Sequence, residues 1–212
     1  MRAAARSATF SLAIPAVLWY DAGKESAKRF APARKHGEGD YTMIRMHIFL
    51  VGMAGAGKTS LGRRLAQNLG WNFVDTDQWV CEMLGMQSVN EVFSSLGEPI
   101  FRNAETGALI ELVGQPPCVV STGGELCTFA ENVTIMKNHG VIIHIDRPLD
   151  QILADIKTDR RPLLAGGSRE DVIDQYNRCI GHYRAAADYR LDNSKGFVMG
   201  IKNLTELVES IR

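Results

Sequence analysis

The stretch Ile48-Phe49-Leu50-Val51-Gly52-Met53-Ala54-Gly55-Ala56-Gly57-Lys58-Thr59 decides the fold of this chain. Its four leading apolar residues predict a buried strand, and the apolar periodicity that follows Lys58 predicts a helix. The loop between them has the form G-x-x-x-x-G-K-[ST], whose glycines let successive backbone N–H groups point at phosphate oxygens. A strand, this loop and a helix together predict a binding site for a nucleoside triphosphate.

Two side chains of this loop have predicted roles of their own. Lys58 supplies a mobile positive charge for the β- and γ-phosphates, and the Thr59 hydroxyl is a ligand for Mg²⁺. The positive end of the helix that begins near Gly57 points at the same anion. The alternative, a glycine-rich turn that carries Lys-Thr by chance, is disfavoured by the flanking strand and helix. The predicted nucleotide-binding residues are Gly52, Ala54, Gly55, Ala56, Gly57, Lys58, Thr59 and Ser60.

The composition suits one globular domain. The chain has 212 residues, of which 45% are hydrophobic and 23% are charged. Its 24 basic residues balance its 24 acidic ones, so no global field favours nucleic acid or an anionic membrane. No run reaches the roughly 18–20 apolar residues of a membrane span, and the four cysteines show neither metal-type nor disulfide-dense spacing. We therefore expect a cytoplasmic monomer without nucleic-acid or membrane partners.

The first 42 residues differ from the rest of the chain. Residues 1–20 contain Arg2 and Arg6 and no acidic residue, and their apolar run from Phe10 to Tyr20 is broken by Ser11 and Pro15. A secretory signal, an organellar transit peptide, and a poorly ordered extension or overlong gene start would each have this character. We favour the last interpretation and place the folded domain at residues 43–212.

Strand and helix patterns alternate from residue 43 onward. Because a helix-length segment follows each strand, we expect a parallel sheet with right-handed crossovers. The predicted fold is α/β, with three layers in which helices cover both faces of a five-stranded parallel sheet. The predicted strands are 46–52, 72–75, 118–121, 141–145 and 189–192, and the predicted helices are 58–69, 78–113 with breaks around Gly85 and Gly97-Glu98-Pro99, 149–156, 169–187 and 204–211.

Ligands of such sheets bind at the carboxyl ends of the strands, where the phosphate loop, Asp75, Asp77 and Gly123-Gly124 all fall. One of the two carboxylates can hold Mg²⁺ through water, and the other can accept a proton from a substrate hydroxyl. Capping of the next helix is the alternative role for either aspartate. The glycine pair is otherwise a plain turn.

Two arginines are candidates for anion binding. Arg102 lies three residues before Glu105 in G-E-P-I-F-R-N-A-E at 97–105, a spacing that is also typical of a surface ion pair. Arg161 lies in R-R-P-L-L-A-G-G at 160–167, a loop that can carry a cation over a transferring phosphate. A solvated basic loop is the alternative for the second motif. We expect a mobile lid at about 157–168.

The order and spacing of these elements resemble the shikimate kinase family, which are small P-loop kinases of the nucleoside monophosphate kinase fold. The resemblance extends from Met46 to about Asn193. The motifs that carry it are G-x-x-G-x-G-K-T at 52–59, Asp75-x-Asp77, G-E-x-x-F-R-x-x-E at 97–105, Gly123-Gly124 and Arg161-Pro-Leu-Leu. The resemblance implies ATP-dependent, Mg²⁺-dependent phosphorylation of a hydroxyl of shikimate, in the biosynthesis of aromatic amino acids.

The same resemblance implies a role for each motif residue. Lys58 and Thr59 would serve ATP and Mg²⁺, Asp75 would support the metal through water, and Asp77 would bind the reacting hydroxyl and act as base. Arg161 would close over the phosphates with the lid. The substrate carboxylate would bind Arg102, beside Gly123 and the backbone of Gly124.

The chain departs from the family at three positions. Glu125 replaces the third glycine of a Gly-Gly-Gly run, Ala154 replaces an arginine that flanks adenine, and Cys179 replaces a second arginine for the substrate carboxylate. The last loss is worth roughly 1.5–3 kcal/mol, or about ten- to a hundredfold in binding. Arg178 is adjacent but turned by about 100° on a helix, and His182 lies one turn along on the same face as Cys179. These two residues are the candidates for compensation.

Three functions therefore compete. The first is an ATP-dependent kinase for shikimate. The second is a sister kinase for another small polyol or hydroxy acid, gluconate-like, with a pocket reshaped at Glu125 and Cys179. The third is a non-catalytic nucleotide-binding homologue, which Asp75, Asp77 and Arg161 argue against, because a pure binder needs neither a base nor a lid cation.

Overall fold

The structure, a computed structural model, describes residues 46–155 and 168–211. The predicted extension at 1–42 lies outside these residues, as do Arg161 and the predicted lid apart from Ser168. The boundaries that we predict for the extension, the domain and the lid therefore stay predictions.

A single parallel sheet forms the centre of the domain. Its strands lie in the order β2-β3-β1-β4-β5, and every neighbouring pair is parallel. β1 and β3 are buried along their whole length, as expected for strands that helices cover on both faces. The predicted five-stranded α/β fold is confirmed. The strands are β1 (His47–Val51), β2 (Asn72–Asp75), β3 (Cys118–Ser121), β4 (Gly140–Asp146) and β5 (Tyr189–Asp192).

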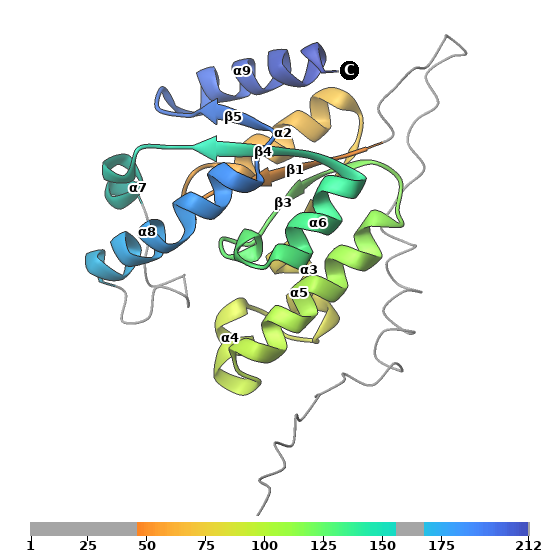
Figure 1. Ribbon diagram of the computed structural model, residues 1–212, viewed down its shortest axis with the longest axis vertical. Coiled ribbons are helices and arrows are strands. Elements are labelled where there is room, and N and C mark those ends of the chain that lie inside the picture. The colour runs from red at the N-terminus through yellow and green to blue at the C-terminus, as the bar shows by residue number, and fades with distance from the viewer. Residues whose placement is uncertain (1–45, 156–167, 212) are drawn as a thin grey trace, which may run out of the picture. The chain divides into compact units, whose positions relative to one another are not determined.

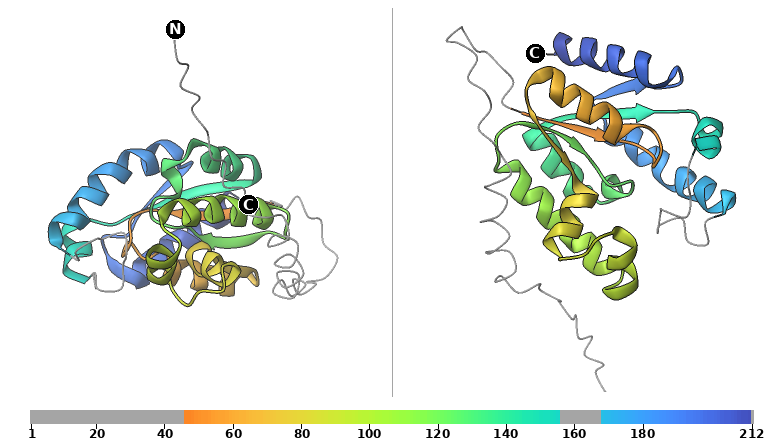
Figure 2. Two further views of the ribbon diagram at one scale, coloured as in Figure 1. Left: turned by 90° about the horizontal axis from the view of Figure 1, so that it is seen from below. Right: turned by 180° about the vertical axis from the view of Figure 1, so that it is seen from behind.

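Helices cover the sheet on both faces (Figures 1 and 2). α2 and α9 pack against each other on one face, and α6 and α8 lie on the other. No helix in residues 46–155 or 168–211 has the length and apolar content needed to cross a membrane. The helices are α2 (Lys58–Leu69), α3 (Thr76–Met83), α4 (Val89–Ser95), α5 (Glu98–Val113), α6 (Ala130–His139), α7 (Leu149–Asp155), α8 (Arg169–Ala186) and α9 (Gly196–Ser210), with a short 3₁₀ helix at Leu126–Thr128.

A small apolar cluster fixes α3, α4 and α5 against one another beside the sheet. Val80, Val92 and Phe101 form its centre, and Ala104 and Ala108 complete it on α5. Because Phe101 is 1% exposed, the cluster holds the first turns of α5 in place. Arg102 follows Phe101 directly and is therefore held at a defined position.

Two helix predictions were wrong at their ends. The predicted break at 97–99 reaches only Gly97, and α5 already contains Glu98 and Pro99, because proline is tolerated in the first turn of a helix. The last helix begins at Gly196 rather than near 204. The apolar residues Phe197 and Ile201 continue the stripe of Leu204 and Val208 toward the N-terminus, so the sequence did contain a signal for this turn that the prediction did not use.

Candidate active site

The phosphate loop has the backbone shape that its glycines predict. Gly52 has φ 141° and Gly57 has φ 105°, a region that L side chains rarely adopt. A Cβ at Gly52 would lie 2.6 Å from the carbonyl oxygen of Ile145, so the loop passes close to the end of β4. The Lys58 ammonium donates hydrogen bonds to the carbonyl oxygens of Gly52 (2.8 Å) and Met53 (3.1 Å). The lysine thus lies across its own loop.

Two residues that the sequence interpretation missed hold this loop from outside. Asn193, buried directly after β5, donates a hydrogen bond from Nδ2 to the carbonyl oxygen of Ala56 (2.8 Å). Arg147, directly after β4, donates from Nη1 to the carbonyl oxygen of Gly55 (3.0 Å) and pairs with Asp155. Both follow the carboxyl end of a strand, and this position was the one signal available in the sequence.

Thr59 joins the loop to the ends of two strands. Its hydroxyl donates to Asp75 Oδ2 at 2.9 Å and lies 3.2 Å from Ser121 Oγ. The other oxygen of Asp75 accepts a hydrogen bond from the backbone N–H of Gln78, so Asp75 is also the N-cap of α3. The capping alternative and the Thr59 contact therefore coexist on this carboxylate.

Asp77 and Glu105 converge on Gly123. A Cβ at Gly123 would overlap Glu105 Oε1 and would lie 2.6 Å from Asp77 Oδ1, so any side chain at this position would have to displace both carboxylates. The backbone N–H of Gly123 donates to Thr76 Oγ1 at 2.9 Å, which fixes its position. Burial raises the pKa of Glu105 from 4.5 to about 7, although the charge of Arg102 acts in the opposite direction. Glu105 is consequently a carboxyl group that titrates near neutral pH.

A cavity of about 1020 Å³ lies at the ends of β2 and β3 and is lined by Asp77, whereas Glu105 and Gly123, both among the described residues, do not line it. The phosphate loop forms one side, the ends of β2 and β3 form its floor, and α3 with the start of α4 forms the other side. Among the predicted site residues, those that line it are Ala54, Gly55, Gly57, Lys58, Thr59, Ser60, Asp75, Asp77 and Gly124. The structure thus places the predicted phosphate loop and both aspartates around a common space.

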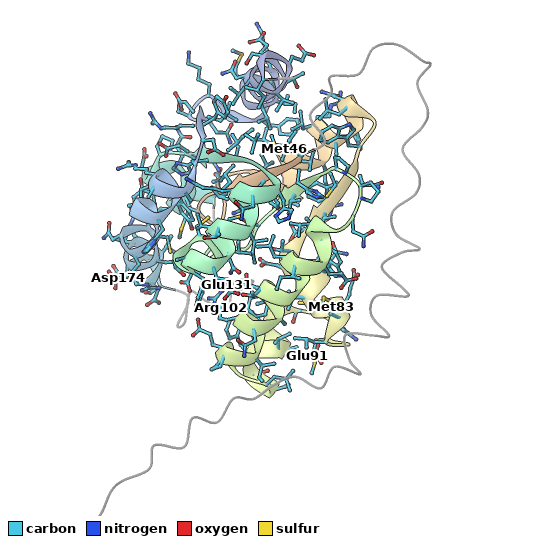
Figure 3. All side chains as sticks on the ribbon, turned by 45° about the vertical axis from the view of Figure 1, so that its right-hand side comes forward. Met46, Met83, Glu91, Arg102, Glu131 and Asp174 are labelled. Carbon is cyan, nitrogen blue, oxygen red and sulfur yellow. The ribbon has the colours of Figure 1, made fainter. Side chains whose placement is uncertain are left out.

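Arg102 is not the surface ion pair that its spacing from Glu105 also allowed. It is 8% exposed, whereas Glu105 is fully buried, and their Nη1 and Oε2 atoms lie 2.7 Å apart. Its Nη2 atom contacts Glu98 (3.0 Å) and Glu125 (2.6 Å). Burial alone would lower the pKa of Arg102, but Glu105, Glu125 and Glu98 together raise it. Arg102, labelled in Figure 3, therefore lies among three carboxylates.

Of the two residues predicted to compensate for Cys179, both of which the structure describes, only Arg178 contacts Glu125, the carboxylate that pairs with Arg102. Arg178 on α8 extends its Nη2 atom to 3.3 Å from Glu125 Oε1. His182 is exposed. Cys179 is 1% exposed, and burial raises the pKa of its thiol. Cys179 is therefore a buried, protonated thiol rather than a charged group at the site.

Gly124 is held by α8. The hydroxyl of Tyr183, which is fully buried, donates to the carbonyl oxygen of Gly124. This contact fixes the backbone of the glycine pair between β3 and the 3₁₀ helix. Tyr183 was not predicted as a site residue, because no local sequence pattern indicates that a tyrosine on a helix will contact a distant backbone carbonyl.

The chain is similar to known proteins along most of the domain. A family model described as shikimate kinase matches residues 54–209. The shikimate kinase of Clostridium beijerinckii is 34% identical over 165 residues, which cover 78% of this chain and 96% of that protein. That of Psychrobacter cryohalolentis is 43% identical over 118 residues, which cover 55% and 63%.

Solved structures give the same result. The shikimate kinase of Acinetobacter baumannii, in complex with shikimate, superposes with a TM-score of 0.70 at 30% identity and covers 78% of this chain and 92% of that one. The shikimate kinase of Aquifex aeolicus superposes with a TM-score of 0.68 at 29% identity, covering 77% and 96%. Because the family model matches residues 54–209 and the Clostridium beijerinckii relative is matched over 96% of its length, the chain belongs to the shikimate kinase family.

Proposed function

We propose that this protein transfers the γ-phosphate of ATP to a hydroxyl of shikimate and forms shikimate 3-phosphate, a step in the biosynthesis of aromatic amino acids. The observation that carries the proposal is the common cavity of the phosphate loop and Asp77. Phosphoryl transfer depends on placing donor and acceptor in line, and this arrangement provides a donor site and an acceptor site around one space. Membership of the family supports shikimate as the acceptor.

The residues of the cavity divide into donor and acceptor groups. Lys58, once released from the carbonyl oxygens of its own loop, binds the β- and γ-phosphates and stabilises the charge that develops there. Asp77 accepts the proton of the attacking hydroxyl. Arg102 holds the substrate carboxylate beside Gly123 and Gly124. Arg161 lies outside the described residues, and its role over the phosphates stays a prediction.

The donor atoms near Thr59 suit Mg²⁺. Thr59 Oγ1, Asp75 Oδ2 and Ser121 Oγ supply only oxygen ligands, which this hard cation prefers, and Thr59 and Asp75 line the cavity. We propose that Thr59 ligates the ion and that Asp75 holds it through water. When bound, Mg²⁺ would neutralise charge on the β- and γ-phosphates.

One observation favours a second candidate. Because Glu125 already pairs with Arg102, and because Cys179 is not charged, a related kinase for a neutral polyol is the alternative.

Measurement of ADP release with ATP, Mg²⁺ and a panel of shikimate, gluconate and neutral polyols tests both candidates. Shikimate-dependent release at millimolar substrate supports our proposal. Release with another acceptor alone would favour the sister kinase, and release with none would favour a nucleotide-binding homologue. A cytoplasmic, monomeric state is part of the proposal.

A further inference from the structure

Glu125 occupies the position where the family pattern has a glycine, and its carboxylate contacts three side chains. Oε2 lies 2.6 Å from Arg102 Nη2, and Oε1 lies 3.3 Å from both Arg178 Nη2 and Gln175 Nε2. The side chain is 14% exposed. A glycine could not supply any of these contacts, so the network around Arg102 is specific to the residue that this chain carries at 125.

The charges around Arg102 are already balanced from within the protein. Glu98 and Glu105, which lie on α5 like Arg102 itself, contact its guanidinium at Nη2 and Nη1, respectively. Glu125 contacts Nη2 as well. Arg178, whose side chain is 61% exposed, is the second cation within reach of Glu125. A substrate carboxylate that approached this guanidinium would therefore be repelled by the carboxylate of Glu125, which already pairs with Arg102.

The shape of the site agrees with this charge distribution. The cavity that contains Asp77 and Gly124 is not lined by Arg102 or by Glu125, both of which belong to the described residues. Arg102 is 8% exposed. The guanidinium predicted to hold the substrate is thus covered on the side of Glu125.

We propose that Glu125 is a built-in competitor for the substrate carboxylate at Arg102, an inference that rests on the proposed function. Before substrate binds, Glu125 neutralises Arg102. When substrate binds, its carboxylate takes the place of Glu125 on Arg102, and Glu125 moves toward Arg178. One carboxylate replaces another at Nη2 while Glu98 and Glu105 stay in contact with Arg102, so the net charge around the buried cation does not change. Arg178 is suited to receive Glu125 because its exposed side chain can move outward with it.

Two variants of Glu125 test this proposal. Glu125→Gly removes the competitor and its bulk, whereas Glu125→Gln keeps the shape and removes the charge. Both should lower the KM for shikimate, the glycine variant by about ten- to a hundredfold and the glutamine variant by less, with kcat nearly unchanged. Glu209→Gln, which removes one charge from an exposed position on α9, is the matched control and should leave KM unchanged.

A binding measurement separates this proposal from the proposed function. Titration calorimetry with 1-cyclohexene-1-carboxylate reports on the carboxylate site alone, since this probe carries no hydroxyl to phosphorylate. Tighter binding of the probe by both Glu125 variants than by wild type and Glu209→Gln supports the competitor, even if shikimate is not phosphorylated. Shikimate turnover by wild type, with KM and probe affinity unchanged or weaker in both variants, overturns it and makes Glu125 a residue that positions Arg102. If turnover and tighter probe binding are both absent, the two proposals fail together.

Discussion

The hydroxyl of Thr59 donates a hydrogen bond to Asp75 Oδ2 across 2.9 Å and so joins the phosphate loop to the end of β2. The two residues are 16 positions apart in the chain, and each was predicted from its own motif to serve one cation. The parallel sheet brings them together because the carboxyl ends of its strands share an edge. Strand order thus brings together the two residues that we propose for Mg²⁺.

Replacement of Lys58 should strongly reduce turnover without unfolding the protein. Its ammonium is the cation that the phosphate loop itself supplies, and electrostatic stabilisation of this kind is worth roughly 3–4 kcal/mol in the transition state. We expect Lys58→Ala to lower kcat by about two to three orders of magnitude. Steady-state ADP release and the circular dichroism spectrum check this. Near wild-type transfer by a folded variant would remove Lys58 from the mechanism.

The two aspartates should respond differently to amide substitution. Asp77→Asn should lower kcat by roughly a hundred- to ten-thousandfold, because an amide cannot accept the proton, and should leave ATP affinity nearly unchanged. Part of this loss would come from altered positioning of the hydroxyl. Asp75→Asn should raise the Mg²⁺ concentration needed for half-maximal activity. Mg²⁺ titrations of both variants at saturating substrates distinguish these effects, and the same Mg²⁺ dependence in both would contradict our division of roles.

The glycine pair offers a matched test of the close approach at Gly123. A Cβ there would displace the carboxylates of Asp77 and Glu105, whereas a Cβ at Gly124 would meet its nearest neighbours, Gln175 and Tyr183, at 3.9 Å. We expect Gly123→Ala to lower both kcat and the free energy of unfolding, the latter by about 1–3 kcal/mol. Gly124→Ala should keep its free energy of unfolding within about 0.5 kcal/mol of wild type. Equal unfolding midpoints in urea would show that the carboxylates adapt to a methyl group.

Local sequence motifs predicted most of the fold and those residues of the candidate site that lie in short motifs. The phosphate loop, Asp75 and Asp77 are short-range patterns, and the structure places them around one cavity. The contacts that hold them are long-range: Asn193 binds Ala56 across 137 residues, and such a pair has no pattern in a single sequence.

The environment of Arg102 could not be predicted for the same physical reason. Its i,i+3 spacing from Glu105 is equally compatible with a surface pair and with a buried one, and only the packing of α5 decides between them. The partner at Glu125 depends on how the 3₁₀ helix after β3 meets α5 and α8. The departure from the family pattern at 125 was visible in the sequence, but its effect on Arg102 was not.

The buried carboxyl of Glu105 should make stability depend on pH. Its pKa in the folded protein, about 7, lies above the ordinary 4.5, so this contribution is fully present below about pH 4.5 and is lost as pH rises to about 7. We expect wild type to lose stability relative to Glu105→Gln across this window, by at most about 1.4 kcal/mol per pH unit. Urea unfolding of both proteins at pH 5, 6, 7 and 8 measures the difference. A difference that does not change with pH would show that Glu105 is already ionised at pH 5.

Cys179 and Glu125 should be coupled in their effect on substrate binding. The Cys179 thiol lies close enough to Glu125 for its charge to contribute to the raised pKa of the thiol. An arginine placed at 179 would therefore meet Glu125 first and pair with it. We expect Cys179→Arg alone to change the KM for shikimate by less than about threefold, because the new cation is neutralised within the protein.

Removal of Glu125 should reveal the effect of that arginine. In Glu125→Gly/Cys179→Arg, neither Arg102 nor the new arginine pairs with a carboxylate at 125, and both can contact the substrate. KM should fall below that of Glu125→Gly by about ten- to a hundredfold. The value of kcat should be nearly unchanged, because carboxylate contacts are alike in the ground state and the transition state. The arginine at 179 also enlarges a buried position, so the unfolding midpoint of each variant is measured first. A double-mutant cycle on KM then gives the coupling. Strictly additive effects in folded variants would show that Glu125 and position 179 act on the substrate independently.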